Sequence, residues 1–405
     1  MNKYPAVPLG EICEIISGAT PKTNIEEYWG TEINWVTPKD LSNLQGKYIQ
    51  STPRKLTKKG LDSCPAVVLP KGSVLLSSRA PIGHVAINGT PMATNQGFKS
   101  LIPSPEKVSA NYLYHWLRAN REKLESLGNG ATFKEISKST VSKIEIPLPP
   151  LQQQEKAAIA IDQVDSLRTK RRRSVELLNE LTESIFFDMF GDITNSKMWE
   201  FGRVSDLVSH FKSGKSLSPA SDETNSKYHI LKISAVTSGT FKPEESKGAP
   251  PEHNPPASHF VQQGDLLFSR ANTLELIGAT ALVDSPQDNL LLPDKLWRFV
   301  WHDEPKADPV YIDHMFSQGN FRDAVRANST GSSGSMKNIS QKKVLSIPCA
   351  LPPLPLQKEF AEKARKIQEI KREQMKHLSH LDELFASVQQ RAFDGTLWDD
   401  RDITV

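Results

Sequence analysis

The chain has 405 residues, of which 38% are hydrophobic and 24% are charged. This apolar content is enough to build packed cores and excludes a wholly disordered chain, and the length predicts about two to four domains. The net charge of +3 is small for a nucleic-acid-binding protein, which usually carries a clear basic excess.

Three further features concern the location of the protein. No run approaches the roughly 18 apolar residues of a membrane helix. Residues 1–9 lack the pattern of a secretory signal. The three cysteines, Cys13, Cys64 and Cys349, are too few and too far apart for a disulfide framework or a zinc cluster. We therefore expect a cytoplasmic protein without membrane contact.

The first 150 residues are rich in proline and glycine, and short apolar or β-branched runs alternate with turn residues. This pattern is typical of strands, which we expect at 33–36, 66–69, 74–76 and 84–87. Apolar residues recur at helical spacing in 110–127, which predicts a helix there. Residues 1–150 are therefore predicted to form a mixed α/β domain.

A long helix is predicted at 151–192. Proline and glycine nearly disappear after Leu148-Pro149-Pro150-Leu151, and apolar residues then recur at alternating spacings of three and four. This spacing favours a coiled-coil helix, about 60 Å long at 1.5 Å per residue. The basic run at 168–173 wraps around such a helix. It is consistent with a solvated surface, with contact to DNA, or with contact to a partner.

The second half repeats the first pattern. Strands are expected at 229–233, 265–268 and 280–283, and a helix at 309–327, within a second α/β domain at 193–350. A second long helix follows in 351–405 and is expected to end near Gly395. Trp398, beyond this glycine, is expected to pack within the chain or against a partner.

The two halves are copies of one another. Residues 130–137 and Leu148-Pro149-Pro150-Leu151 correspond to 334–340 and 351–354 at a constant offset of 203 residues. Upstream, 75–80 resembles 266–271 at an offset of 191, and Ser17-Gly18 is echoed by Ser213-Gly214. A constant offset in one part and a drifting offset in the other indicate a rigid element beside a loop-rich one.

The fold class that follows is α+β. We expect two mixed α/β domains separated by two long antiparallel coiled-coil helices, related by an internal pseudo-twofold repeat. In that arrangement the polar seam residues Arg171 and Ser174 would lie near Gln374 and His377 and set the register. Local fraying of both helices at mid-length is the alternative.

This organisation resembles the specificity subunit of type I restriction–modification enzymes. The resemblance is carried by the duplicated segments Ile146–Glu155 and Ile347–Glu359, by the glycine-containing segments that precede them, and by the two Leu-Leu-x-Ser-Arg-Ala runs at 75–80 and 266–271. One departure is that the Ile347-Pro348 step is displaced from the following Leu-Pro-Pro. This displacement leaves the junction of strand and helix open.

The resemblance implies a function as well as a fold. In this family two target recognition domains each read one half of a bipartite site in double-stranded DNA. The helices hold the domains apart and dock two methyltransferase subunits, while restriction (motor) subunits complete the enzyme and the catalysis lies in these partners. A helix of roughly 60 Å lying along the duplex would span on the order of 15 base pairs.

A fused enzyme with a hidden catalytic site is one alternative. The segment Asn254-Pro255-Pro256-Ala257 resembles an amino-methyltransferase loop but lacks the aromatic residue that stacks on a flipped base. The run 213–216 resembles a phosphate-binding loop, but Ser209 replaces its first glycine. Asp294, Glu304 and Lys306 mimic a nuclease pattern that Pro305 opposes. We therefore expect no catalytic site, no cofactor and no metal. A two-domain interaction scaffold is the other alternative.

Candidate DNA contacts come from polar and basic side chains that end strands or lie in glycine-containing loops. Arg79 and Arg270 end the duplicated runs, and each could equally be a structural arginine. Asn95 and Gln96 could read adenine or cap a turn. The full set of candidates is Lys39, Arg79, Asn95, Gln96, Thr132, Lys134, Lys232, Arg270, Ser335, Lys337 and Asn338.

The charge is unevenly distributed along the chain. Residues 1–150 contain 18 basic and 12 acidic side chains, whereas 193–350 contain 17 of each. Phosphate contacts dominate non-specific affinity for DNA. The chain alone is therefore predicted to bind DNA weakly and mainly through its first half, with partners supplying further phosphate contacts.

Overall fold

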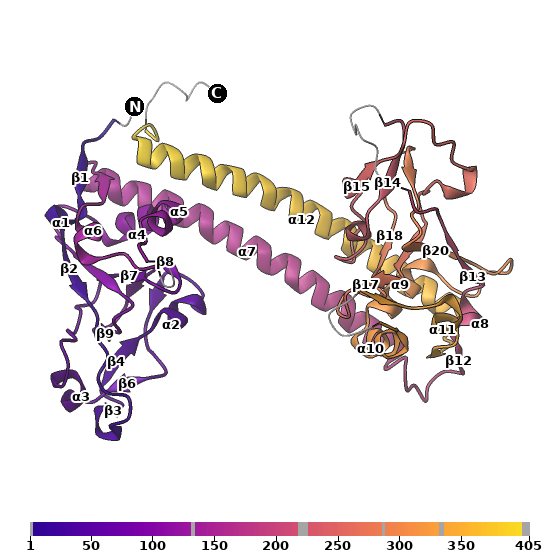
Figure 1. Ribbon diagram of the computed structural model, residues 1–405, viewed down its shortest axis with the longest axis horizontal. Helices are drawn as coiled ribbons and strands as arrows, with labels where there is room; N and C mark the ends of the chain where they lie inside the picture. The colour runs from indigo at the N-terminus through magenta and orange to yellow at the C-terminus, as the bar shows by residue number, and fades with distance from the viewer. Residues whose placement is uncertain (1–2, 131–133, 218–225, 286–287, 332–335, 399–405) are drawn as a thin grey trace. The chain divides into compact units, whose positions relative to one another are not determined.

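The computed structural model describes residues 3–130, 134–217, 226–285, 288–331 and 336–398. The chain separates into two compact units, one comprising Met1–Arg172 with Lys376–Val405 and the other comprising Arg173–Met375 (Figure 1). Two long helices, α7 (Leu151–Phe190) and α12 (Leu354–Asp394), each contribute a segment to both units. The predicted α+β class with two long helices is confirmed. The division into 1–150, 151–192, 193–350 and 351–405 stays a prediction.

The first unit is built on a five-stranded and a four-stranded sheet. The five-stranded sheet has the order β2 (Cys13–Ser17), β10 (Lys99–Pro103), β7 (Val74–Ser78), β8 (Ile82–Asn88), β5 (Tyr48–Ile49). The four-stranded sheet has the order β3 (Trp29–Gly30), β6 (Lys55–Leu56), β4 (Ile33–Val36), β9 (Met92–Thr94). A separate pair joins β1 (Ala6–Pro8) to β11 (Glu145–Pro147). The shorter helices are α1 (Leu9–Ile12), η1 (Glu26–Tyr28), α2 (Pro38–Ser42), α3 (Lys58–Asp62), α4 (Ala110–Ala119), α5 (Arg121–Ser126) and α6 (Lys138–Ser142).

Most of the strands expected in this unit are present. The strand expected at 66–69 is wrong, because only Leu69 pairs, through an isolated bridge to Met92. Pro65 and Pro70 flank the segment and cannot donate ladder hydrogen bonds, which opposes a strand there. The helix expected at 110–127 is divided into α4 and α5 at Asn120, whose backbone leaves the helical region.

Helix α4 joins the sheet to the long helices within this unit. Its Tyr112, Leu113 and Leu117 are fully buried in a cluster that includes Val74 and Ile82 of the sheet. The Tyr112 hydroxyl donates to the carbonyl of Pro147 at 2.9 Å, which satisfies its polar end. Full burial of each of these apolar side chains is worth about 1.5–3 kcal/mol.

The second unit repeats this plan with shorter strands. The four-stranded sheet has the order β13 (His210–Ser213), β20 (Leu296–Val300), β16 (Leu266–Ser269), β18 (Thr280–Leu282). The three-stranded sheet has the order β15 (Ser246–Gly248), β14 (His229–Leu231), β19 (Leu290–Leu291). Two pairs join β12 (Phe201–Arg203) to β22 (Pro348–Ala350) and β17 (Ala271–Asn272) to β21 (Lys337–Asn338). The shorter helices are α8 (Val204–Leu207), η3 (Ile233–Ala235), η4 (Ala257–His259), α9 (Pro309–Ser317), α10 (Gly319–Asn328) and α11 (Gln341–Leu345).

The three strands expected in this half are present, although the first ends at Leu231 and continues as η3. The helix expected at 309–327 is divided into α9 and α10 at Gln318, whose ψ of 133° is extended. Both halves therefore break the same predicted helix into two shorter ones.

The junction of strand and helix is identical in the two halves despite the displaced Ile-Pro step. Strand β11 begins at Glu145 and α7 at Leu151, while β22 begins at Pro348 and α12 at Leu354. Both elements are therefore shifted by the same 203 residues as the sequence repeat.

The long helices pair in opposite directions, as expected. Within the first unit, Ile161 of α7 shares a buried cluster with Phe393 near the end of α12. Further along α7, Arg168 bonds to Asp382, which lies earlier on α12. Within the second unit, Phe186 and Phe190 pack on Phe360 with ring centroids 5.2 and 5.6 Å apart. The polar layer expected around 171, 174, 374 and 377 falls at the boundary between the units and stays a prediction.

Candidate nucleic-acid interface

A parallel pair of strands creates a polar edge in the first unit. Strand β4 runs parallel to β9, with Val36 opposite Thr94. The carboxyl ends of parallel strands lie at the same edge of a sheet, so the segments that begin at Thr37 and Asn95 leave the sheet together. The carboxylate of Asp40 accepts from the backbone N–H of Thr37 at 2.7 Å and starts α2. Lys39 therefore lies exposed on a short helix rather than in the expected loop.

Asn95 shapes the turn at this edge. Its Oδ1 accepts from the backbone N–H of Gly97 at 2.9 Å, while its own N–H donates to the carbonyl of Val36 at 3.0 Å. The exposed side chain of Gln96 accepts from the hydroxyl of Thr20. Asn95 therefore caps a turn, and its amide NH₂ group is not used in that bond.

Gly18 explains the repeated Ser-Gly step. A Cβ atom at Gly18 would lie 2.0 Å from the carbonyl oxygen of Asn95, so only glycine allows the two segments to approach. In the second half, a Cβ atom at Gly214 would lie 1.5 Å from the carbonyl oxygen of Leu292. The same close approach thus recurs at both edges.

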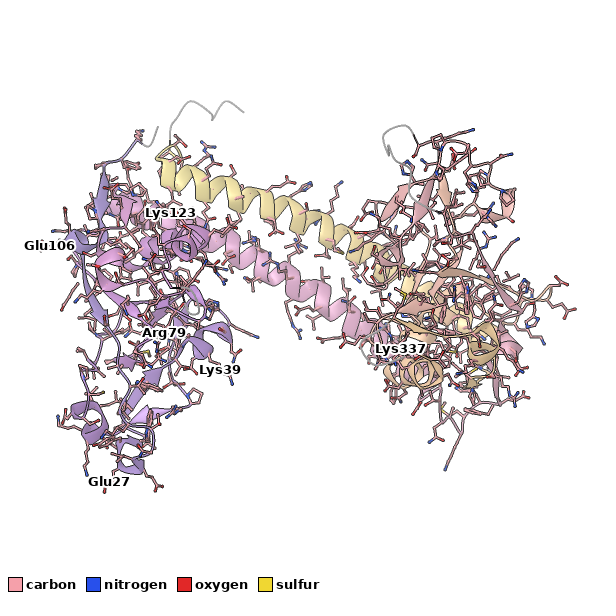
Figure 2. All side chains as sticks on the ribbon, viewed as in Figure 1. Glu27, Lys39, Arg79, Glu106, Lys123 and Lys337 are labelled. Carbon is pink, nitrogen blue, oxygen red and sulfur yellow. The ribbon has the colours of Figure 1, made fainter. Side chains whose placement is uncertain are left out.

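Arg79 lies beside this turn. A Cβ atom at Gly97 would contact Asn95, Pro38 and Arg79 within 3.6 Å, so these three residues surround one point (Figure 2). Arg79 Nη1 lies 3.9 Å from Glu135 Oε2, and the side chain of Arg79 is 34% exposed. Lys99, which is nearly buried, holds the other oxygen of Glu135 at 3.0 Å. Arg79 is thus tethered but still reaches solvent.

The segment after residue 130 also reaches this edge. The backbone N–H of Ile136 donates to the carbonyl of Ser78 at 3.0 Å, which places the exposed Lys134 near the end of β7. The structure therefore brings Lys39, Arg79, Asn95, Gln96 and Lys134 to one region of the first unit. Thr132 lies outside the described residues.

The second unit has a related edge with different chemistry. Strands β14 and β19 are parallel, with Ile230 opposite Leu291, so Lys232 and Asp294 follow their carboxyl ends. Arg270 Nε donates to the backbone carbonyl of Asp294 at 2.8 Å, and its Nη2 lies 3.7 Å from Asp294 Oδ2. Arg270 is thus partly committed to an internal carboxylate at the position where the first unit has amide side chains.

Lys337 and Asn338 lie in β21 rather than in the loop that was expected. Asn338 pairs with Ala271, and the N–H of Ile339 donates to the carbonyl of Arg270 at 3.1 Å. Lys337 Nζ donates to the carbonyl of Gly331 at 2.5 Å and stays partly exposed (Figure 2). These bonds bring the segment beside Arg270, as the related bond does beside Arg79. Ser335 lies outside the described residues.

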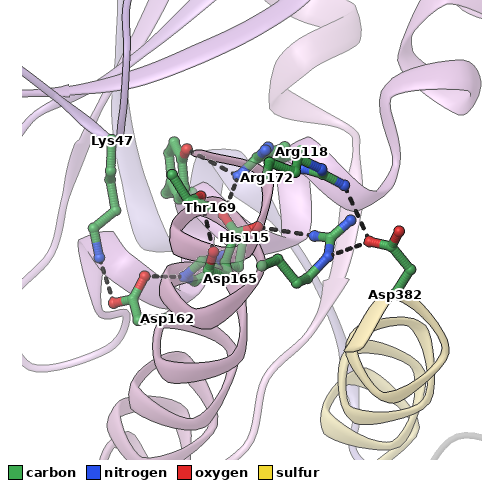
Figure 3. A network of polar contacts seen from close by, with 10 residues as sticks. Lys47, His115, Arg118, Asp162, Asp165, Thr169, Arg172 and Asp382 are labelled. Carbon is green, nitrogen blue, oxygen red and sulfur yellow. Dashed lines mark hydrogen bonds and ion pairs between the residues drawn. The ribbon is translucent and has the colours of Figure 1, made fainter. Parts of the chain in front are cut away.

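The basic run at 168–173 is largely neutralised within the helices. Arg168 and Arg172 lie 2.6 and 3.0 Å from Asp382 of α12 (Figure 3), and Arg173 pairs with Glu176 and Glu180 of its own helix. The sequence did not indicate these partners, because Asp382 lies more than 200 residues away in the chain.

The same contact region contains residues that the sequence analysis missed. His115 Nε2 lies 2.8 Å from Asp162, and Lys47 lies 2.5 Å from the other oxygen of this carboxylate (Figure 3). Arg118 pairs with Asp165 at 2.9 Å. These contacts fasten the first unit's domain to its segment of α7.

Features of other protein classes were also sought in the described part of the chain. No group of three or more His, Cys, Asp or Glu side chains there could hold a metal ion. No helix among these residues is long and apolar enough to cross a membrane. Asp294, one acid of the nuclease-like pattern, is paired with Arg270.

Comparison with known proteins identifies the class. Residues 1–179 match the family model of the type I restriction modification DNA specificity domain. The chain is 38% identical over 206 residues to the type I restriction enzyme MjaIX specificity subunit of Methanocaldococcus jannaschii, covering 50% of this chain and 48% of that protein. This alignment thus spans about half the length of that relative. The chain is also 26% identical over 430 aligned residues to the EcoKI specificity subunit of Escherichia coli, covering 96% of this chain and 88% of that protein.

The fold leads to the same class. The structure matches the crystal structure of the type I restriction–modification S subunit from M. genitalium with a TM-score of 0.60 and 13% identity, covering 97% of this chain and 96% of that chain. The protein is therefore of the kind that carries DNA specificity domains on paired long helices. The chain belongs to the specificity (S) subunits of type I restriction–modification systems, and such a subunit is itself non-catalytic.

Proposed function

We propose that this chain reads a bipartite site in double-stranded DNA, with one half-site for each unit. It would direct two methyltransferase subunits and the restriction subunits to that site in the cytoplasm. The observation that supports this proposal most strongly is the duplicated polar edge. Each unit presents side chains at the carboxyl ends of a parallel strand pair, beside an arginine that ends the neighbouring strand.

The chemistry of the first edge suits base reading. The amide of Asn or Gln can bond to adenine, and arginine can bond to guanine, through the major groove. Gln96 is exposed, and Asn95 keeps its NH₂ group outside the turn bond to Gly97. Lys39 is exposed on α2 and supplies a charge suited to a phosphate.

The second edge differs at the same position. Asp294 replaces the amides and pairs with Arg270, so the two edges offer different donors and acceptors. Two half-sites with different sequences would follow, because each unit recognises bases through its own side chains.

The long helices supply the spacer and a surface for partners. Ile159 and Leu167 of α7 and Leu384 of α12 lie in the first unit and are about half exposed. In the second unit, Phe187 and Ile370 are also exposed. Exposed apolar side chains on a helix favour a protein partner, and we infer that the methyltransferase subunits cover them.

The experiment that tests this function is a map of methylated bases in the genome of a host that carries this chain with its methyltransferase. A motif of two short specified parts separated by unspecified bases is expected. A single uninterrupted motif, or the same motif without this chain, would contradict the proposal. Tight binding of S-adenosylmethionine to the isolated chain would instead support a fused enzyme.

A further inference from the structure

A basic hollow lies in the second unit beside the edge described above. It has a volume of about 220 Å³, and its lining includes four lysines, Lys215, Lys232, Lys247 and Lys295. We propose that this hollow binds a backbone phosphate of the DNA and so sets the position of the second half-site. This inference rests on the proposed function, because it assumes that the unit meets a duplex.

The four lysines come from separate segments of the chain. Lys215 follows β13, Lys232 follows β14, Lys247 lies within β15, and Lys295 precedes β20. Segments that are brought together only by folding thus place four amines around one hollow. The chain shows no basic run there that would have revealed it.

The floor of the hollow is apolar. Leu217, Ile230 and Ile233 line it between the lysines. The methylene stems of lysine can pack on such a surface while the amines stay at the rim. Lysines held in this way lose less side-chain entropy on binding than freely moving ones.

The positive charge of the hollow is not balanced locally. Asp294 is its one acidic lining residue among those described, and this carboxylate lies 3.7 Å from Arg270. In the described part of the chain no carboxylate forms an ion pair with Lys215, Lys232 or Lys295. Lys247 donates to the backbone carbonyl of Leu217 at 3.2 Å, a neutral acceptor that leaves its charge in place.

A neighbouring histidine reports the same field. The pKa of His259 is lowered, first by burial and then by the positive charges of His253, Lys212, Lys215 and Arg298. The excess is local, because 193–350 as a whole contains equal numbers of basic and acidic side chains. Such a concentration of charge attracts an anion.

A phosphate fits this site better than a base edge does. Lysine is a compact charge with three donors, whereas a base edge is neutral and is read by groups of fixed geometry. Phosphate contacts fix the position of a protein on the duplex, which the adjacent Arg270 and Asn338 would need in order to meet their bases.

The experiment measures how the affinity of the full chain for a labelled duplex of arbitrary sequence changes with salt. Lys232→Ala, Lys295→Ala and the double variant are compared with the wild type between 50 and 200 mM KCl. Lys306→Ala is the matched control, because Lys306 is exposed in the same unit and lies outside the hollow. Each lost phosphate contact lowers the slope of log K against log salt by about 0.9.

We expect a slope lower by about 0.9 for each single variant and by about 1.8 for the double variant, with the control unchanged. Lys232→Arg should restore the slope, because it keeps the charge. Slopes equal to that of the wild type would overturn the inference. Lys232 is exposed, so its removal leaves the fold intact and decides the question even if Lys295→Ala unfolds the unit.

Two further arms separate the possible failures. The same proteins are titrated with a duplex carrying the mapped site and with a scrambled one. If the wild type prefers the mapped site while the lysine variants keep the wild-type slope, the inference fails and the proposed function stands. If the wild type shows no preference, the proposed function fails. Release of the duplex by millimolar inorganic phosphate at constant ionic strength, absent in Lys232→Ala, would show that the hollow also takes free phosphate.

Discussion

Gln154 and Gln357 make the same three hydrogen bonds in the two halves of the molecule. Gln154 is fully buried, accepts from the N–H of Ser109 at 2.9 Å and donates to the carbonyls of Lys107 and Pro149 at 2.9 and 2.8 Å. Gln357 accepts from the N–H of Asp308 at 3.0 Å and donates to the carbonyls of Lys306 and Pro352 at 3.3 and 2.8 Å. Each amide joins the start of a long helix to the loop before α4 or α9.

Gln154→Ala is expected to destabilise the first unit, and Gln357→Ala the second, by about 2–4 kcal/mol each. Each substitution removes three hydrogen bonds and leaves buried backbone groups without a partner. Chemical denaturation followed by circular dichroism measures the loss. Gln152→Ala is the control, because Gln152 is exposed on the same turn and should change stability by less than about 0.5 kcal/mol. Equal effects at 152 and 154 would contradict this explanation.

Gly18→Ala and Gly214→Ala should each destabilise the edge of their own unit by about 1–3 kcal/mol or more. A methyl group would overlap a backbone carbonyl that cannot move without displacing the adjacent turn. Thermal unfolding is the measurement. Gly319→Ala provides the comparison, because nothing lies within 4 Å of a Cβ atom there. If the variants at 18 and 214 melt with the control, the close approach is not needed for the fold.

Arg79→Ala is expected to weaken recognition of one half-site by about 1–3 kcal/mol and Arg270→Ala that of the other. Both arginines end the corresponding strand and lie beside the turn that we propose meets DNA. Methylation of a library of altered sites reports the change for each half. Arg121→Ala is the control, because this arginine pairs with Glu125 on α5. Unchanged motifs in both variants would make Arg79 and Arg270 structural.

Inserting four residues near Ser174 in α7 should lengthen the preferred spacer and leave both half-sites unchanged. Four residues add about 6 Å at 1.5 Å per residue, or roughly two base pairs at 3.4 Å. Mapping methylated sites in the host measures the spacing. Insertion of four residues after Gly264, in the turn before β16, is expected to leave the spacer unchanged. A change in the half-site sequences themselves would argue against the helices as a ruler.

Asp313→Asn should stabilise the second unit at pH 8 and have little effect below pH 4. Burial raises the pKa of Asp313 to about 6 from 3.8. The carboxyl group therefore favours folding while it is protonated, and this contribution is lost as the pH rises through about 6. Melting temperatures between pH 4 and 8 test the prediction, with exposed Asp303→Asn as the control. A constant difference at all pH values would exclude ionisation as the cause.

The repeat and the long helices could be predicted because they depend on local patterns. The constant offset of 203 residues is explained by the buried amides of Gln154 and Gln357 and by the aromatic pairs Tyr112–Phe393 and Tyr311–Phe190, which recur in both units. Loops outside these contacts tolerate insertions, so the offset drifts there. The strand expected at 66–69 was wrong because the flanking prolines outweigh its apolar content.

The sequence by itself determined the duplicated α+β organisation, the family and the residue types at the ends of the repeated strands. These follow from periodicity, turn chemistry and repetition, which act over short stretches of chain. The tertiary structure alone decided that Arg168 and Arg172 are neutralised by Asp382 and that four lysines from separate segments line one hollow. Electrostatic contacts depend on distance in space, and a separation along the chain does not reveal which charges folding brings within a few ångströms.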